Sequence, residues 1–430
     1  IEKYGETHAI LSRCLHRSVA GCLADAGWKA GYLEWCRTFS STPEEEENET
    51  VAAEEAAHLI LHRILCYELF RTQLDLLDDS LKRKHRVPRV TLEPLTAAAI
   101  AGTPVMDALG EHFAALSRVN YEQVFAPDPV LDTIPLDHEA EEAVRAFLED
   151  VEAFSFDVGN FEEARRLFPT VFEALLPAEK RRRYGQVFTP RPLVDLLCRV
   201  CIRTPDARVL EPACGTGAFL DGAYDRLDAL ALEAGKPLLH DALLGRLYGV
   251  EIGTFPLHLC AVRLALKHPA IPTHARLRHS DFFETTPKAL CGEEGMDVVL
   301  GNPPYIRQEA LTTKDAIRAR IRAAMGEAAP GGRAYPYTPR DADAYFYFVE
   351  YATAFLREGG IAGWVLSDKF LVVEGGRALK QFLLDHYHVR AVILLGRRAF
   401  ADALVDNCIL VLERRAGGAA ERIRSHVVRE

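Results

Sequence analysis

The sequence predicts an α/β fold in which a doubly wound, largely parallel sheet follows a mainly helical N-terminal domain. Two observations lead to this prediction. Apolar runs of strand length recur between residues 209 and 413, and stretches with helical spacing separate them. Over the first 170 residues, apolar side chains instead recur at helical spacing, most clearly over residues 53–77. We therefore expect a helical domain over residues 1–170 and an α/β domain over residues 180–415.

Within the helical domain, residues 42–52 form an acidic and polar run with Pro43 near its start. A run of like charges repels itself and buries little apolar surface, so we expect a mobile linker there.

The first predicted strand, residues 209–211, ends in Glu211 and leads through a glycine-rich turn into a helix. Gly215 and Gly217 let the backbone approach a ligand closely, and the start of the helix offers unpaired N–H groups. The third glycine of a dinucleotide fingerprint is missing, as is the Gly-Lys-Ser/Thr of a phosphate-binding loop. Taken alone, the turn fits a plain helix start as well as it fits a ligand site.

Two further predicted strands are followed by acids. Residues 247–251 end in Glu251, whose carboxylate can accept both hydroxyls of a ribose. Residues 275–278 precede Asp281, which can accept from an adenine amino group, and Phe282, whose ring can cover the base. Each acid alone is commonly a helix cap, but their ordered succession favours a nucleotide-like ligand.

The next apolar run, residues 298–301, predicts a buried strand that ends in Asn302-Pro303-Pro304-Tyr305. Because proline has no N–H and a fixed φ, this loop is stiff and its carbonyls remain available. An exocyclic amine can donate its two protons to the Asn302 side-chain oxygen and the Pro303 carbonyl while its ring stacks on Tyr305. The alternative is a structural turn that ends the strand.

The rest of the chain continues the alternation. Between the glycine turn and Glu251, the break at residues 234–237 predicts two helices. After Tyr305 we expect helices over residues 343–357 and 376–387, and strands over residues 360–366, 389–395 and 408–413. The last two strands would complete a sheet of seven.

In this order the motifs resemble those of S-adenosylmethionine-dependent methyltransferases that act on amino groups in DNA. One more segment, Gly185-Gln186-Val187-Phe188-Thr189-Pro190, is similar to the segment that precedes the glycine turn in gamma-class N6-adenine DNA methyltransferases. In that family it packs against the methionine end of the cofactor. The resemblance covers residues 161–414 and implies a Rossmann-like, seven-stranded class I methyltransferase sheet. It also implies that a target-recognition region follows, with residues 416–430 at the start of the linker to it.

The resemblance assigns roles to individual positions. The catalytic residues would be Asn302, Pro303, Pro304 and Tyr305. The residues that bind S-adenosylmethionine would be Gln186, Val187, Phe188, Thr189, Glu211, Ala213, Gly215, Gly217, Glu251, Ile252, Asp281, Phe282 and Asn302. No metal is implied.

Charge and composition restrict the setting. The net charge of −11 argues against a protein that holds DNA by bulk electrostatics alone. A local basic stretch nevertheless follows the catalytic loop over residues 307–340, and we expect it to be mobile without DNA and to contact phosphates. Its candidate contacts are Arg307, Arg318, Arg320 and Arg322. Ten scattered cysteines, no membrane-length apolar run and no signal peptide predict a cytoplasmic protein, and the resemblance implies a bacterial one.

The sequence therefore predicts a site-specific enzyme that methylates N6 of a flipped adenine in double-stranded DNA. The family implies bacterial restriction–modification or phage defence, with a separate specificity or nuclease subunit as a partner. Three alternatives stay open: a release-factor glutamine methyltransferase, an RNA N-methyltransferase, and a non-catalytic methyltransferase-like scaffold.

Overall fold

The computed structural model describes most of the chain, namely residues 2–37, 47–84, 87, 91–153, 189–268, 271, 275–292, 294–306, 308, 311, 313–326, 334–395 and 407–415. Four predicted site residues, Gln186, Val187, Phe188 and Arg307, lie outside the described residues, as do residues 416–430. The chain divides into two compact units. The first contains Ile1–Arg183 and Gly253–Leu277, and the second contains Tyr184–Ile252 and Arg278–Glu430.

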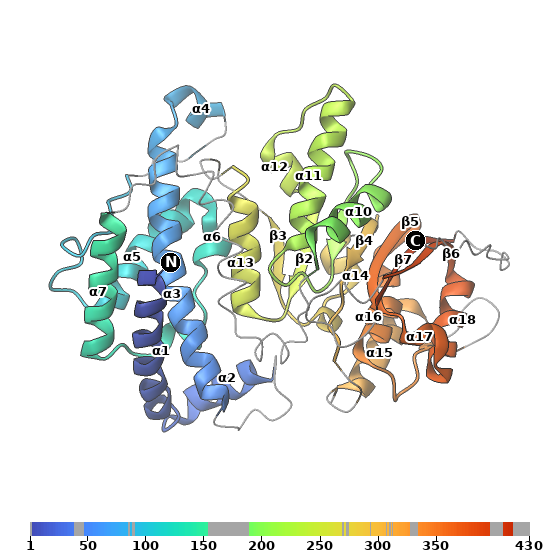
Figure 1. Ribbon diagram of the computed structural model, residues 1–430, viewed down its shortest axis with the longest axis horizontal. Coiled ribbons are helices and arrows are strands. Elements are labelled where there is room, and N and C mark those ends of the chain that lie inside the picture. The colour runs from blue at the N-terminus through green and yellow to red at the C-terminus, as the bar shows by residue number, and fades with distance from the viewer. Residues whose placement is uncertain are drawn as a thin grey trace. The chain divides into compact units, whose positions relative to one another are not determined.

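The first unit is helical, as predicted (Figure 1). Its elements are α1 (Glu2–Cys22), α2 (Ala26–Cys36), α3 (Glu47–Leu76), α4 (Asp79–Lys84), α5 (Val105–Leu116), a π-helix (Ser117–Tyr121), α6 (Glu122–Phe125), a 3-10 turn (Leu131–Thr133) and α7 (His138–Glu152). Helix α3 begins earlier than predicted, so residues 47–52 of the expected linker are helical. The reason is that Glu47 and Glu49 suit the first turn of a helix, while Val51 and Ala52 are buried.

Helix α13 (Thr254–Ala265) follows a strand of the sheet in the sequence but packs with the helical unit. Thr254 Oγ1 donates to Asp128 Oδ2 at 2.7 Å, and His258 lies buried beside His62 of α3. The predicted domain of residues 180–415 is therefore not one continuous unit.

The histidine pair has one consistent proton arrangement. A carbonyl can only accept, so the Nδ1–H of His258 donates to Val124 O at 2.9 Å. In the neutral ring the Nε2 of His258 then accepts from the Nδ1–H of His62, at 2.6 Å. In this arrangement the Nε2 of His258 carries no proton, so the His258 ring is neutral.

The second unit is built on a seven-stranded sheet with strand order β3-β2-β1-β4-β5-β7-β6, which confirms the predicted sheet. The strands are β1 (Val209–Glu211), β2 (Leu247–Glu251), β3 (Arg276–His279), β4 (Met296–Gly301), β5 (Leu356–Ser367), β6 (Tyr387–Leu394) and β7 (Asn407–Arg414). Strand β1 pairs in parallel with β2 and β4, and β4 pairs in parallel with β5. Strand β7 lies antiparallel between β5 and β6.

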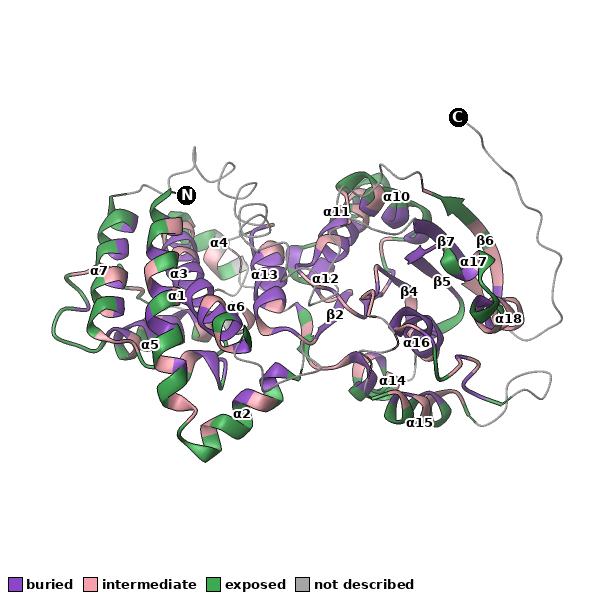
Figure 2. Ribbon diagram, turned by 60° about the horizontal axis from the view of Figure 1, so that its bottom comes forward, coloured by how far each residue is buried: buried purple, intermediate pink, exposed green. Residues whose placement is uncertain are grey.

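Helices cover both faces of this sheet, as Figure 2 shows. Helices α10 (Arg191–Cys201) and α11 (Ala218–Glu233) lie on one face, and α14 (Pro287–Cys291), α15 (Lys314–Met325) and α16 (Ala344–Ala352) on the other. The remaining helical elements are α12 (His240–Leu244), α17 (Lys369–Val372), α18 (Arg377–His386) and 3-10 turns at Phe282–Glu284, Thr353–Phe355 and Glu374–Gly376. The two helices predicted between the glycine turn and β2 are confirmed as α11 and α12.

The basic stretch after the catalytic loop is more ordered than predicted. Helix α15 occupies its first half and packs Ile317 and Ile321 into the core of the sheet unit. The prediction that the whole stretch is mobile is therefore wrong for residues 314–325, because the sequence pattern hid two core positions one turn apart. No helix in the described part of the chain is both long and apolar enough to span a membrane.

The buried histidine pair leads to a pH-dependence prediction. Burial lowers the pKa of His62 well below 6.5, and burial together with Arg63 lowers the pKa of His258 to about 3. The unfolded chain binds these protons below pH 6.5, whereas the folded chain does not. The contribution of the two neutral histidines to the unfolding free energy is therefore fully present above pH 6.5 and is lost as the pH falls. We expect the free energy of urea unfolding of the protein to fall by about 1.4 kcal/mol per pH unit through His258 between about pH 6.5 and pH 4, and His62 to add a loss in the same direction.

The variant His258→Gln should flatten this pH dependence. The matched change His16→Gln, at an exposed position of α1, should leave it as it is in the parent protein. An unchanged slope in His258→Gln would show that the pair does not titrate with folding.

Candidate active site

The four predicted catalytic residues follow β4 at the carboxyl edge of the sheet. Strand β4 is central and buried, and its last residue, Gly301, pairs with Trp364 of β5. Pro303 is buried, whereas Asn302, Pro304 and Tyr305 are half-buried. The loop therefore leaves a fixed strand end with its functional side chains only partly covered.

The Asn302 side chain is oriented by Thr189. The Nδ2 of Asn302 donates to the Thr189 Oγ1 at 3.2 Å. Because the two ends of an amide lie on opposite sides of Cγ, this contact sets the direction in which the amide oxygen of Asn302 faces. The sequence predicted Thr189 as a cofactor contact, and the structure gives it this additional orienting role.

Tyr305 is held at its hydroxyl by Asn407, the first residue of β7. The hydroxyl donates to Asn407 Oδ1 at 2.9 Å and lies 3.5 Å from the carbonyl oxygen of Val365. The ring is tilted by 49° against Tyr345, with the ring centroids 6.5 Å apart. Burial raises the pKa of Tyr305 well above its usual value, so the hydroxyl remains a neutral donor.

Asn407 is a site residue that the sequence reasoning missed. It is 3 % exposed and is followed in the strand by five apolar residues. The sequence signal that could have identified Asn407 is a polar residue at the start of β7, taken together with the direction of that strand. Since β7 runs antiparallel to β5, its first residue lies at the same edge as the ends of the parallel strands.

The glycine turn joins β1 to α11 through two residues with positive φ. Gly215 has φ of 50°, and Gly217, the N-terminal cap of α11, has φ of 82°. Only glycine adopts these angles without strain. The Cys214 N–H donates to Val250 O at 2.9 Å, which attaches the turn to β2, and Ala213 beside it is half-buried.

Glu251 is bonded to the same turn. One carboxylate oxygen of Glu251 accepts from the Gly215 N–H at 2.8 Å, and the side chain is almost fully buried. The Ile252 carbonyl accepts from His279 Nε2 at 2.9 Å. The predicted ribose acceptor thus lies against the predicted cofactor turn.

Glu211 has a structural contact within the site. Its Oε2 accepts from the Leu220 N–H at 3.2 Å, in the first turn of α11, and it is 3 % exposed. A Cβ at Gly301, where φ is 155°, would lie 3.4 Å from Glu211 Cγ. A side chain at the end of β4 would therefore touch Glu211 at van der Waals distance and would be strained at this φ.

Asp281 and Phe282, which follow β3, both make contacts within the chain. Asp281 caps the following 3-10 turn by accepting from the Phe283 N–H at 3.0 Å, and burial raises the pKa of its carboxyl group. The Phe282 ring packs against Phe355 with centroids 4.9 Å apart and is 3 % exposed. Its large apolar surface is used in the core, and the expectation that this ring covers an adenine stays a prediction.

The predicted DNA-contacting arginines make contacts within the chain. Arg318 donates to the carbonyl of Thr338, and Arg322 Nε donates to Tyr335 O at 3.1 Å. Arg320 pairs with Glu284 at 2.5 Å and remains exposed. Arg318 and Arg322 thus fasten residues 335–338 to α15, a role that the sequence did not predict.

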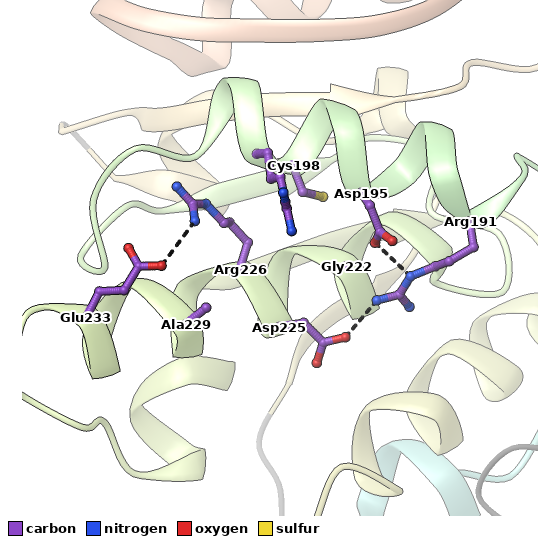
Figure 3. A pocket seen from close by; sticks show the side chains of 9 residues that line it. Arg191, Asp195, Cys198, Gly222, Asp225, Arg226, Ala229 and Glu233 are labelled. Carbon is purple, nitrogen blue, oxygen red and sulfur yellow. Dashed lines mark hydrogen bonds and ion pairs between the residues drawn. The ribbon is translucent and has the colours of Figure 1, made fainter.

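A hollow of about 560 Å³ lies between α10 and α11 (Figure 3). Five of its six charged side chains form ion pairs, Arg199 being the exception: Arg191 bonds Asp195 and Asp225, each at 2.7 Å, and Arg226 lies 3.9 Å from Glu233. These pairs connect the two helices, and α10 begins two residues after Thr189. The ion pairs across the hollow therefore hold the start of α10, next to Thr189, against α11. They also leave little unpaired charge for a ligand. Among the described residues, no group of three or more His, Cys, Asp or Glu side chains could hold a metal ion.

Comparison with known proteins places this geometry in context. The family model described as N-6 DNA Methylase matches residues 163–424. The type II methyltransferase M.BstVI of Geobacillus stearothermophilus is 29% identical over 235 residues, which cover 50% of this chain and 39% of that protein. The EcoEI methylase subunit of a type I restriction enzyme from Escherichia coli is 26% identical over 241 residues, covering 55% and 44%. The chain thus spans less than half the length of these two relatives.

A solved structure has the same fold. The type I restriction-modification system methyltransferase subunit from Streptococcus thermophilus matches with a TM-score of 0.53 at 15% identity. The match covers 94% of this chain and 85% of that one.

The bond between Tyr305 and Asn407 can be measured by a double-mutant cycle. Asn407→Ala leaves a largely buried hydroxyl with only the weak contact to Val365 O, so it should lower the unfolding free energy by about 1–3 kcal/mol. Tyr305→Phe should cost less, and the two changes should couple by about 0.5–1.5 kcal/mol in urea unfolding. Additive effects would mean that the hydrogen bond contributes nothing to stability.

Proposed function

The chain belongs to the N-6 DNA methylase family, and on this basis we propose that it transfers a methyl group from S-adenosylmethionine to N6 of an adenine in DNA. The observation that carries the proposal is the position of Asn302-Pro303-Pro304-Tyr305. This loop leaves β4 at the edge where the glycine turn and Glu251 also meet. An amine acceptor set and a cofactor turn therefore share one edge of one sheet.

The chemistry of the amine explains what the loop has to do. The lone pair of an exocyclic adenine amine is delocalised into the ring, so the nitrogen is a poor nucleophile. Accepting both N–H bonds, at the Asn302 amide oxygen and the Pro303 carbonyl, favours the pyramidal nitrogen of the transition state. The contact with Thr189 prepares the Asn302 amide for this role before the base arrives.

The residues present fit the proposed cofactor. A Cβ placed on Gly215 would meet no atom within 4 Å, so open space adjoins the turn. The Glu251 carboxylate, held beside that space by the Gly215 N–H, suits the hydroxyls of a ribose. Bound there, S-adenosylmethionine would supply an electrophilic methyl group on a sulfonium.

Tyr305 would hold the base itself. An adenine inside a duplex cannot reach this loop, so it has to leave the base stack and find a new stacking partner. The Tyr305 ring can provide it, because the bond to Asn407 fixes the ring at its far end. The same bond uses the hydroxyl, which leaves the ring to act through its face.

The relatives suggest the biological setting. Their names describe a type II methyltransferase and a methylase subunit of a type I restriction enzyme. We propose a role in restriction–modification, on double-stranded DNA, in which recognition of the site belongs to another region or to a separate specificity subunit. The match to a DNA methylase family does not favour the glutamine-methylating, RNA-methylating or scaffold alternatives.

The test separates the amine acceptor from the cofactor site. In a tritium-transfer assay with the full-length protein and bacterial DNA lacking N6-methyladenine, Asn302→Ala should lower transfer roughly a hundredfold or more. Calorimetry should show nearly unchanged affinity for S-adenosylmethionine, because we propose that the Asn302 side chain acts on the base and contributes little to the cofactor binding that the resemblance also implies for it.

Glu251→Gln is the matched variant at the proposed cofactor site, where the affinity for S-adenosylmethionine should change. The new amide keeps an acceptor for the Gly215 N–H but loses the charge, so cofactor affinity should fall by about 1–3 kcal/mol. If Asn302→Ala retained most of its activity, or if the protein methylated release-factor protein and not DNA, the proposal would be wrong.

A further inference from the structure

Apolar side chains are exposed in an uneven pattern over the described residues. Ten large apolar side chains are exposed there, and five of them belong to two short segments of the sheet unit. These five are Val372, Val373, Val392, Ile393 and Leu394. Val372 has the highest exposure of all ten, at 84%.

Both segments lie at the carboxyl edge of the sheet. Since β5 and β6 each run antiparallel to β7, they are parallel to each other. Their last residues, Ser367 and Leu394, pair with Asn407 and Cys408. Asn407 is also the residue that holds Tyr305, so the exposed apolar segments follow strand ends at the same sheet edge as the proposed adenine site.

The segment after β5 is a rigid knuckle, defined here as Leu371–Glu374. The side chain of Phe370, the residue before this segment, is buried in the core with 1 % exposure. Lys380 Nζ donates a hydrogen bond to Leu371 O at 2.9 Å. Any side chain at Gly376 would overlap the backbone of Phe370, so the chain turns back tightly there. The knuckle therefore holds Val372 outward in a fixed position.

The surroundings of the knuckle are basic. Residues 369–380 contain Lys369, Arg377 and Lys380 against the single acid Glu374. The whole chain carries a net charge of −11, so this positive segment departs from the average. An apolar tip between cations suits a polyanion with an apolar interior, which is the chemistry of duplex DNA.

We propose that the Val372–Val373 tip enters the base stack of the DNA beside the adenine that leaves it. This inference rests on the proposed function, because only an enzyme that extracts a base needs such a device. Removing an adenine from the stack leaves its neighbours without a stacking partner. Aliphatic side chains inserted at base steps restore part of the lost contact and widen the step.

The test compares a DNA duplex whose target adenine is base-paired with one whose target adenine has no partner base. Sequencing the DNA of cells that express the full-length protein gives the methylated site, which is then placed in synthetic duplexes. One duplex has the target adenine paired with thymine, and the other has it opposite an abasic position. The double variant Val372→Ser with Val373→Ser should methylate the paired duplex roughly tenfold or more slowly than the parent. On the opened duplex the two proteins should differ by less than about threefold, since opening is no longer required.

Val200→Ser is the control. It makes the same change at an exposed valine of α10, whose C-terminal end precedes β1 and so lies at the opposite edge of the sheet. It should match the parent on both duplexes, and thermal unfolding should show that all variants are folded.

Three results would overturn the inference. The double variant could methylate the paired duplex as fast as the parent, or its methylation rate could fall by the same factor on both duplexes. It could also retain full activity but lose a co-purifying subunit, in which case the tip is a protein interface. If the parent methylates neither duplex, the proposed function itself fails, which is distinguishable from a failure of the tip alone.

Discussion

Parallel pairing of β1 with its two neighbours is the constraint on which the whole site depends. Strand β1 has only three residues, yet it aligns with β2 on one side and with β4 on the other. This register brings the ends of three separate strand segments to one edge, at Glu211, Glu251 and Gly301. A slip by one residue would turn each side chain to the opposite face of the sheet. Gly301 and Glu211 lie at adjacent strand ends in this register, so that a Cβ at Gly301 would be in van der Waals contact with Glu211.

Two side-chain contacts then fix the loop on that edge. Thr189, from the segment before α10, orients Asn302, and Asn407, from the start of β7, holds Tyr305. The two anchors come from positions more than a hundred residues away on either side of the loop. The proposed amine acceptor and the proposed stacking ring are thus positioned independently of each other. Such preorganisation lowers the cost of reaching the transition state.

Local patterns in the sequence predicted the sheet and the loops that follow its strands, because short apolar runs bounded by turns have local causes. The glycines at 215 and 217 were interpretable for the same reason, since positive φ restricts the residue type. Contacts between distant segments were not predictable in this way. The packing of α13 with the helical unit, the Asn407 anchor and the burial of Phe282 each depend on a partner far along the chain. Arg318 and Arg322 illustrate the same limit, because composition alone cannot separate a phosphate contact from a bond to a backbone carbonyl.

The central claim is that the carboxyl edge of β4 binds the amine that receives the methyl group. The most direct measurement is a structure of the full-length protein with S-adenosylhomocysteine and DNA that carries its methylated site. The account predicts an extrahelical adenine whose N6 lies about 3 Å from both the Asn302 amide oxygen and the Pro303 carbonyl oxygen, with its ring on Tyr305. An adenine that remains in the duplex, or an N6 bound by other residues with Asn302 facing away, would contradict it.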